Sequence, residues 1–161
     1  MRVNFLPMRD DCIVPTRADQ GSSGWDLSIP SNDPVKVLYP GERTLIKLGF
    51  AVEMIVPDVS MYKDYLFPSG FQIDIRPRSG NAFKKGLTVL NSPGLIDASY
   101  RDQIGVILIN LGQDPITLSP SDKIAQAVLT PYWSMEFEIV SELGETERGT
   151  KGFGESSGTV K

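Results

Sequence analysis

An alternation of apolar and polar residues with a period of two is the feature that most constrains this fold. It runs through residues 44–50, 71–76 and 135–139, where Ile, Leu, Phe and Met alternate with polar or charged residues. Successive side chains of a β-strand point to opposite faces, so each segment predicts a half-buried strand. Residues 104–109 are apolar on both faces. This run therefore predicts a strand that lies in the core or packs against another subunit.

Turn signals separate these segments. Pro-Gly pairs occur at 40–41 and 93–94, in a chain with 12 prolines and 15 glycines. At 93–94 proline presets φ and glycine tolerates a positive φ, so this pair is strong turn chemistry. One short helix is predicted from Ser79, as the N-cap, to Lys85, with Gly86 as its C-terminal stop. Many short strands and little helix predict an all-β, jelly-roll-like barrel or sandwich.

Composition narrows the function classes. The length of 161 residues fits one domain. A net charge of −4 gives no general basic field, so nucleic acid is not expected as a partner. Cys12 is the only cysteine. That excludes an intramolecular disulfide and favours a cytoplasmic location, or the nucleus or host cytosol for a eukaryotic or viral source.

Two features that the sequence lacks narrow the possible functions further. No stretch approaches 18 apolar residues, so no membrane is expected as a partner. The chain contains no histidine, which removes the commonest general base. Acid–base chemistry would therefore fall to carboxylates.

The stretch from Asn91 to Gln103 is the best candidate for a pocket. Its turn is followed by Asp97, Tyr100 and Arg101, directly before the apolar run. A hairpin that opens a buried strand and carries a carboxylate, an aromatic hydroxyl and a guanidinium can line a binding site. A second candidate lies at the start of the short helix, where free N–H groups favour a phosphate beside Arg78 and Ser79.

Four further stretches accompany this hairpin along the chain. They read Ser-Gly-Trp-Asp-Leu at 23–27, Arg-Pro-Arg-Ser-Gly-Asn-Ala at 76–82, Lys-Ile-Ala-Gln at 123–126 and Arg-Gly-Thr-Lys-Gly-Phe-Gly at 148–154. Each alone is a weak signal. The set of five, in this order and at these spacings, resembles the motifs of the trimeric dUTPases over nearly the whole chain.

The resemblance implies a fold and an activity. The expected molecule is an all-β, jelly-roll-like homotrimer that hydrolyses dUTP to dUMP and pyrophosphate with Mg²⁺. It would comprise a β domain over residues 1–140 and a flexible glycine-rich arm over 141–161. The arm would close over the active site of a neighbouring subunit.

The resemblance also implies roles for single residues. Asp97 matches the catalytic carboxylate that activates water for attack on the α-phosphorus. Asn91 would read uracil, since an amide can pair with the uracil carbonyl and N3–H and mismatch cytosine. Tyr100 would pack on the deoxyribose and exclude a 2′-hydroxyl. Asp26 would help to hold Mg²⁺ through water.

The remaining implied residues bind substrate. Ser79 would reach a bridging oxygen of the triphosphate, and Arg78 and Gln126 would contact phosphates. In the arm, Arg148 would grip phosphate and Phe153 would stack on uracil. The other substrate-binding positions are Gly80, Gly94, Ile96 and Gly154.

Two alternatives remain open. Residues 56–70 are longer than the compact family connection and carry several aromatics, so they are a possible site for a protein partner of a dUTP-binding regulator. A relative of the dCTP deaminases is the less favoured alternative. Those enzymes resemble this chain around Arg78 and Ser79 but need a glutamate on the strand after the hairpin, and residues 106–109 read Val-Ile-Leu-Ile.

Overall fold

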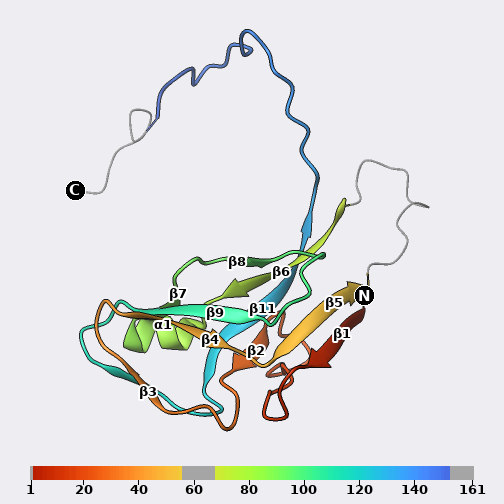
Figure 1. Cartoon of the computed structure of the whole chain (residues 1–161). Coiled ribbons are helices and arrows are strands. Elements are labelled where there is room, and N and C mark those ends of the chain that lie inside the picture. The colour runs from red at the N-terminus through yellow and green to blue at the C-terminus, as the bar shows by residue number, and fades with distance from the viewer. Residues whose placement is uncertain (1, 56–67, 153–161) are drawn as a thin grey trace.

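The computed structural model describes residues 2–55 and 68–152. Within these residues the chain forms eleven strands and one short helix (Figure 1). The strands are β1 (Arg2–Pro7), β2 (Trp25–Ser28), β3 (Lys36–Leu38), β4 (Arg43–Lys47), β5 (Phe50–Ile55), β6 (Gly70–Arg76), β7 (Leu87–Val89), β8 (Gly94–Ile96), β9 (Gly105–Asn110), β10 (Ile116–Leu118) and β11 (Lys123–Tyr132), and the helix is α1 (Ser79–Lys85). The expected all-β class with one short helix is confirmed.

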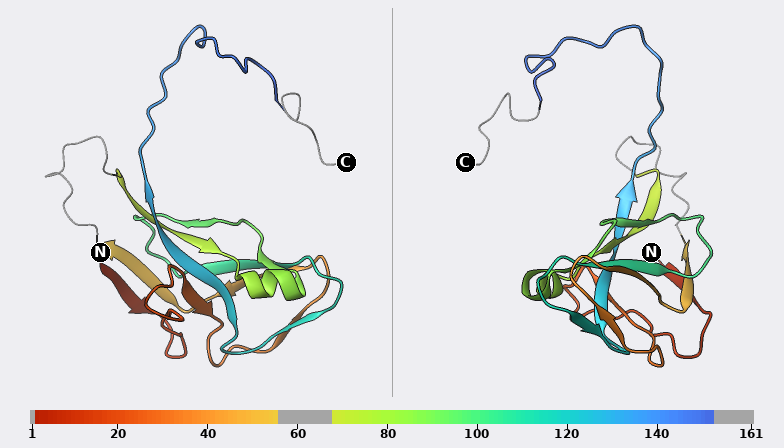
Figure 2. Two further views of the ribbon diagram at one scale, coloured as in Figure 1. Left: turned by 180° about the vertical axis from the view of Figure 1, so that it is seen from behind. Right: turned by 60° about the vertical axis from the view of Figure 1, so that its left-hand side comes forward.

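Antiparallel pairing organises these strands into four sheets. The largest has the order β2-β11-β6-β8, and a three-stranded sheet has the order β4-β9-β7. Two ribbons, β1-β5 and β10-β3, complete the described strands. Figure 2 shows the two larger sheets layered in the body, with α1 at one end.

The core lies between the inner faces of these sheets. Ile73 and Ile75 of β6 and Val106 and Leu108 of β9 are buried in one continuous cluster. The alternation over 44–50 is confirmed, although Gly49, with φ of +79°, divides the segment into β4 and β5. Burial of this apolar area is the main stabilising contribution to the fold.

The outer face of the β4-β9-β7 sheet is also apolar. Leu45 is 51% exposed, and the half-buried Ile107 pairs with it across β4 and β9. Ile109 is likewise half-buried, and Leu90, directly after β7, is exposed. The run at 104–109 is thus buried on one face and half-open on the other, which is typical of a strand covered by another subunit.

The start of α1 differs from the prediction. Arg78, with φ of −85° and ψ of 130°, occupies the N-cap position, and no side chain caps the helix. Ser79 is the first helical residue, so its expected capping role is wrong. An ion pair from Arg78 and a hydrogen bond to the Pro77 carbonyl hold this loop extended, which leaves the Ser79 hydroxyl outside the cap. Gly86 ends the helix with φ of +69°, as expected.

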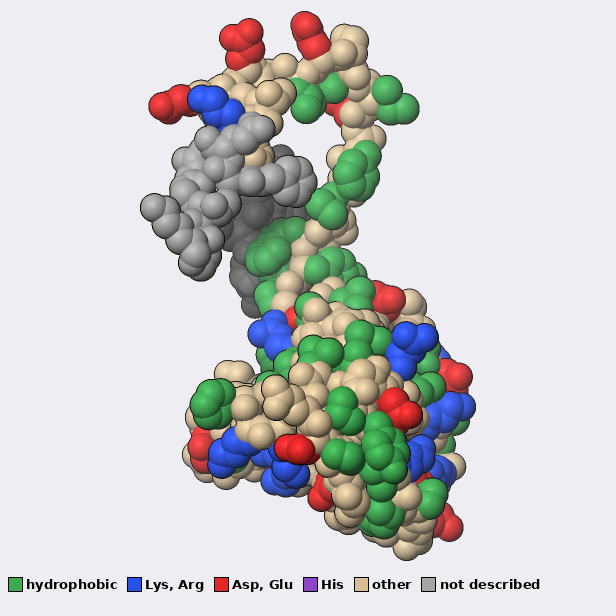
Figure 3. All heavy atoms as spheres, turned by 90° about the vertical axis from the view of Figure 1, so that its left-hand side faces the viewer, with side chains coloured by type: hydrophobic (Ala, Val, Ile, Leu, Met, Phe, Trp, Pro, Cys, Tyr) green, Lys and Arg blue, Asp and Glu red, His purple; other side chains and the backbone are tan. Residues whose placement is uncertain are grey.

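The predicted strand over 135–139 is absent from the described fold. The last strand ends at Tyr132, and the following residues extend away from the body (Figure 3). Phe137 is 90% and Ile139 100% exposed. A strand needs a pairing partner, and none of the described strands pairs with this segment. The division at residue 141 stays a prediction.

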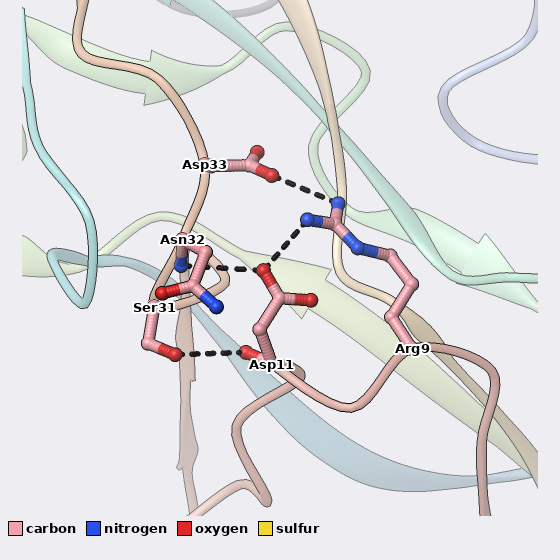
Figure 4. A network of polar contacts seen from close by, with 5 residues as sticks. All are labelled: Arg9, Asp11, Ser31, Asn32 and Asp33. Carbon is pink, nitrogen blue, oxygen red and sulfur yellow. Dashed lines mark hydrogen bonds and ion pairs between the residues drawn. The ribbon is translucent and has the colours of Figure 1, made fainter.

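A polar network fastens the loop after β1 to the turn before β3 (Figure 4). Arg9 Nη2 lies 2.7 Å from Asp11 Oδ2, and Arg9 Nη1 lies 2.8 Å from Asp33 Oδ1. The backbone N–H of Asn32 donates to Asp11 Oδ2 at 3.2 Å. Hydrogen bonds to Asp33 and then Asp11 raise the pKa of Arg9. This network contains none of the predicted site residues and joins two loops of the scaffold.

Candidate functional site

A pocket of about 320 Å³ lies where β8 and the following turn meet β4 and β9. Its lining includes five of the predicted site residues: Asn91, Gly94, Ile96, Asp97 and Tyr100. Its size is at the lower end of the range for small-molecule sites. The structure therefore brings together the residues predicted to read the base, fit the sugar and activate water.

Close packing explains the glycine at position 94. A Cβ atom there would lie 3.3 Å from both Asn91 Nδ2 and Ile75 Cβ. Gly94 lies in β8 and does not have a positive φ. The turn does not use the wider range of φ that glycine allows, and the physical reason for glycine is the space that the Asn91 amide occupies.

The turn that carries Asp97 is braced by its own neighbours. The backbone N–H of Tyr100 donates to the Asp97 carbonyl at 3.1 Å, and Arg101 Nη1 donates to the Ala98 carbonyl at 2.6 Å. The Tyr100 hydroxyl donates to the Gln103 carbonyl at 3.1 Å, which fixes the ring beside the pocket. Asp97 itself is exposed, so its carboxylate is accessible to water and substrate.

A second group of predicted residues gathers around Asp26. Its Oδ1 lies 2.9 Å from Arg78 Nε, and its Oδ2 lies 2.8 Å from Lys123 Nζ. Asn81 Nδ2 donates to the Lys123 carbonyl at 2.9 Å and joins α1 to β11. Two cations and one carboxylate next to the exposed start of α1 form a surface that suits an anion.

Gln126 belongs to this second group and depends on a glycine. Its Nε2 donates to the Pro77 carbonyl at 2.9 Å, so it supports the loop that carries Arg78. A Cβ at position 24 would collide with the Gln126 side-chain amide. Gly24 therefore leaves the space in which the Gln126 side chain lies.

The strand register separates the two groups. Asp26 pairs with Gln126, and Gln126 pairs with Arg76, so these side chains share the outer face of the large sheet. Ile75 pairs with Gly94 on the opposite, inner face. β2 and β8 are also three strand spacings apart, about 14 Å. One copy of the chain does not present the pocket and the Asp26 group to the same side.

Not all the predicted residues enter these groups. Ser79 and Gly80 are exposed at the start of α1. Arg148 lies in the extended segment, where its Nε donates to the Lys151 carbonyl at 2.9 Å. Phe153, Gly154 and residues 56–67 of the 56–70 segment lie outside the described residues.

Sequence reasoning placed Arg101 in the hairpin without a specific contact and assigned no roles to Lys123, Gly24 and Asn81, although all four stand inside the motifs. Their contacts are with backbone carbonyls, a carboxylate or a crowded amide. The only signal for them was their position within each motif. Spacing along the chain does not reveal which strand lies beside which.

Among the described residues, no group of three or more Asp, Glu, His or Cys comes together as a metal cage. Asp26 is a single carboxylate, which suits Mg²⁺ that takes its other ligands from phosphate and water. No helix in the described part of the chain is long and apolar enough to cross a membrane.

The amino-acid sequence is similar to those of known proteins over most of its length. The family model described as dUTPase matches residues 10–157. The deoxyuridine 5'-triphosphate nucleotidohydrolase of Bdellovibrio bacteriovorus is 44% identical over 88% of this chain and 85% of its own length.

Two solved structures share the fold. A mutant dUTPase of Staphylococcus bacteriophage 80alpha with dUpNHpp has a TM-score of 0.77 at 23% identity, over 97% of this chain and 98% of that one. A mutant dUTPase of phage phi11 of S. aureus, described with a structural Mg(II) ion, has a TM-score of 0.71 at 22% identity, over 90% and 100%. With the family match over most of its length, the chain belongs to the dUTPase family, enzymes that hydrolyse dUTP to dUMP and pyrophosphate.

Proposed function

We propose that this chain hydrolyses dUTP with Asp97 as the residue that activates water. The observation that carries this proposal is the pocket in which Asn91, Gly94, Ile96 and Tyr100 surround the same space as Asp97. A carboxylate at the edge of a nucleoside-sized pocket lies near the α-phosphate of a bound nucleotide.

The reaction step needs one nucleophile and one leaving group. Asp97 orients a water molecule and takes its proton as the water oxygen bonds to the α-phosphorus. The bond from the α-phosphorus to the bridging oxygen breaks, and pyrophosphate leaves with that oxygen. Orientation and charge stabilisation supply most of the rate in such transfers, so a fixed turn under Asp97 is consistent with the role.

The base and sugar are read inside the pocket. The Asn91 amide has one acceptor and two donors, which match the uracil carbonyl and N3–H and mismatch cytosine. A mismatched base leaves buried polar groups without partners, and this costs binding energy. Tyr100 is held by its bond to the Gln103 carbonyl and packs on the deoxyribose, where it excludes a 2′-hydroxyl.

The triphosphate lies on the Asp26 group. Arg78, Ser79, Gly80 and Gln126 bind phosphate oxygens there. Asp26 would hold Mg²⁺ through water, and its ion pairs keep Arg78 and Lys123 in place. The metal, when bound, neutralises charge on the phosphate oxygens.

We further propose that the complete site forms between copies of the chain in a homotrimer. The pocket and the Asp26 group face opposite sides of one sheet, so a neighbouring copy must supply one of them. Part of the apolar outer face of β4-β9-β7 lies outside the pocket, with Ile109 and Leu90, and supports such packing.

The extended segment after β11 fits the same assembly. Its exposed apolar side chains, Phe137 and Ile139 among them, are those of a strand that pairs with another copy. Beyond it, Arg148, Phe153 and Gly154 would cover the nucleotide in a neighbouring subunit. A protein partner at residues 56–70 and a cytoplasmic location stay predictions.

Pyrophosphate release with Mg²⁺ tests the function. We expect release from dUTP and at least a hundredfold less from dCTP, dTTP and UTP, in line with discrimination by paired polar groups. Equal release from dUTP and UTP would contradict the role of Tyr100. Equal release from dUTP and dCTP would contradict the role of Asn91.

A further inference from the structure

The outer face of the large sheet carries a second arginine–aspartate pair beside the Arg78–Asp26 pair. Arg76 Nη2 lies 2.8 Å from Asp74 Oδ2. The register aligns Arg76 with Gln126, and Gln126 with Asp26, on one face. Arg76 is thus one strand spacing, about 4.8 Å, from a residue proposed to bind phosphate.

Asp74 is anchored within the sheet. Its side chain is only 5% exposed and accepts hydrogen bonds from Gln72 Nε2 and Thr130 Oγ1, each at 3.0 Å. Neighbouring side chains on β6 and β11 therefore fix this carboxylate. A fixed carboxylate in turn sets the direction of the Arg76 guanidinium.

Arg76 keeps donors for a ligand. A guanidinium carries five N–H donors. Within the described residues, the polar side-chain contact of Arg76 is the one with Asp74, and its side chain is 46% exposed. Its planar donors match phosphate oxygens in pairs.

The local charge favours an anion on this face. Arg76, Arg78 and Lys123 are three cations, against the two carboxylates of Asp26 and Asp74, while the whole chain has a net charge of −4. A local excess of positive charge in an acidic protein attracts a polyanion to that surface.

We propose that Arg76 is a further phosphate-binding residue for dUTP, with Asp74 as its positioning residue. The inference rests on the proposed function, which places the triphosphate on this face. Arg76 lies on the other face of the sheet from the pocket of the same copy, so it contributes to the phosphates and not to the base. It therefore raises the preference for a triphosphate over a monophosphate.

Substitution of Arg76 separates binding of the phosphates from binding of the nucleoside. We expect Arg76→Gln to raise KM for dUTP by about tenfold, with kcat within about twofold. The inhibition constant of inorganic tripolyphosphate rises by about the same factor, because this inhibitor has no nucleoside and binds only through its phosphates. Inhibition by dUMP stays the same. Arg76→Lys recovers part of the loss, since it keeps the charge but not the planar donors.

Arg2→Gln is the matched control, because it removes an exposed arginine on β1 that has no place in the site. Should Arg76→Gln fail to fold, Arg76→Lys and Asp74→Asn carry the test, each with an expected rise of about threefold in KM for dUTP.

Failure of the Arg76 inference and failure of the proposed function would give different results. An unchanged KM and unchanged tripolyphosphate inhibition in folded Arg76 and Asp74 variants would overturn the inference and leave Arg76 as a structural partner of Asp74. Absence of dUTP turnover in the unsubstituted protein would count against the proposed function instead. Tripolyphosphate binding would then still test Arg76 directly.

Discussion

Glycines at two positions of this protein are explained by the side chains beside them. Gly94 leaves room for the Asn91 amide, and Gly24 leaves room for the Gln126 amide. Both glycines stand in motifs that the sequence singled out, and Gly94 does not have the positive φ that glycine tolerates in a turn. A Pro-Gly pair is typical of a turn, so the sequence points to backbone conformation as the reason for glycine. The reason in the structure is crowding by side chains from other segments of the chain, and no local sequence pattern reveals such a contact.

Gly24→Ala tests this reading at the residue scale. The added methyl group displaces the Gln126 side chain, which loses its bond to the Pro77 carbonyl and loosens the Arg78 loop. We expect KM for dUTP to rise about fivefold and unfolding free energy to fall by about 1–2 kcal/mol. Steady-state kinetics and urea unfolding measure the two effects.

Gly21→Ala is the control, because Gly21 lies outside the motifs and a Cβ there makes only an ordinary contact, 3.4 Å from Asp19 Oδ1. If Gly24→Ala and Gly21→Ala have the same KM, the position of the Gln126 side chain does not depend on Gly24.

Strands are the elements that the sequence predicted best, because their period of two is strong where one face is buried. β6 illustrates the limit of that reasoning. Its alternation placed Asp74 with the exposed set, but Asp74 is buried among Gln72, Arg76 and Thr130. The extended segment at 135–139 illustrates the other limit. Its alternation is that of a strand, but no described strand pairs with it, and in the proposed trimer a second copy would supply the partner.

Acid titration tests the Asp74 network at the element scale. Burial alone would raise the pKa of Asp74, but hydrogen bonds from Arg76, Gln72 and Thr130 outweigh it and lower the pKa below the ordinary value of 3.8. The stabilisation is therefore complete above pH 3.8 and is lost as the pH falls through the lower, folded-state pKa.

We expect Asp74→Asn to unfold with about one proton fewer taken up in this acid range than the unsubstituted protein. Urea unfolding between pH 5 and pH 2.5 measures the difference. Asp10→Asn, at an exposed acid, is the control. If the free energy of unfolding falls with decreasing pH in Asp74→Asn as steeply as in the unsubstituted protein, a group other than Asp74 causes the loss of stability in acid.

At the scale of the whole molecule, two groups of predicted site residues lie apart within one copy of the chain. The pocket with Asp97 and the group with Arg78 lie on opposite faces of one sheet. The sequence predicted the members of both groups through motif resemblance. It did not predict their separation, because faces of a sheet follow from register between distant strands. The proposed trimer would resolve the separation by placing one copy's pocket against its neighbour's phosphate-binding group.

Mixing two inactive variants tests this central claim most directly. Asp97→Asn and Arg78→Gln, each alone, are expected to fold, assemble and lose most dUTP turnover, by about 10²-fold or more. The two are unfolded together, refolded at equal concentrations, and assayed for pyrophosphate release beside each variant treated alone. If Asp97 and Arg78 of one site come from different copies, random mixing restores about a quarter of the sites. Recovery near that level is the predicted result. A mixture no more active than its parts would contradict a site shared between copies.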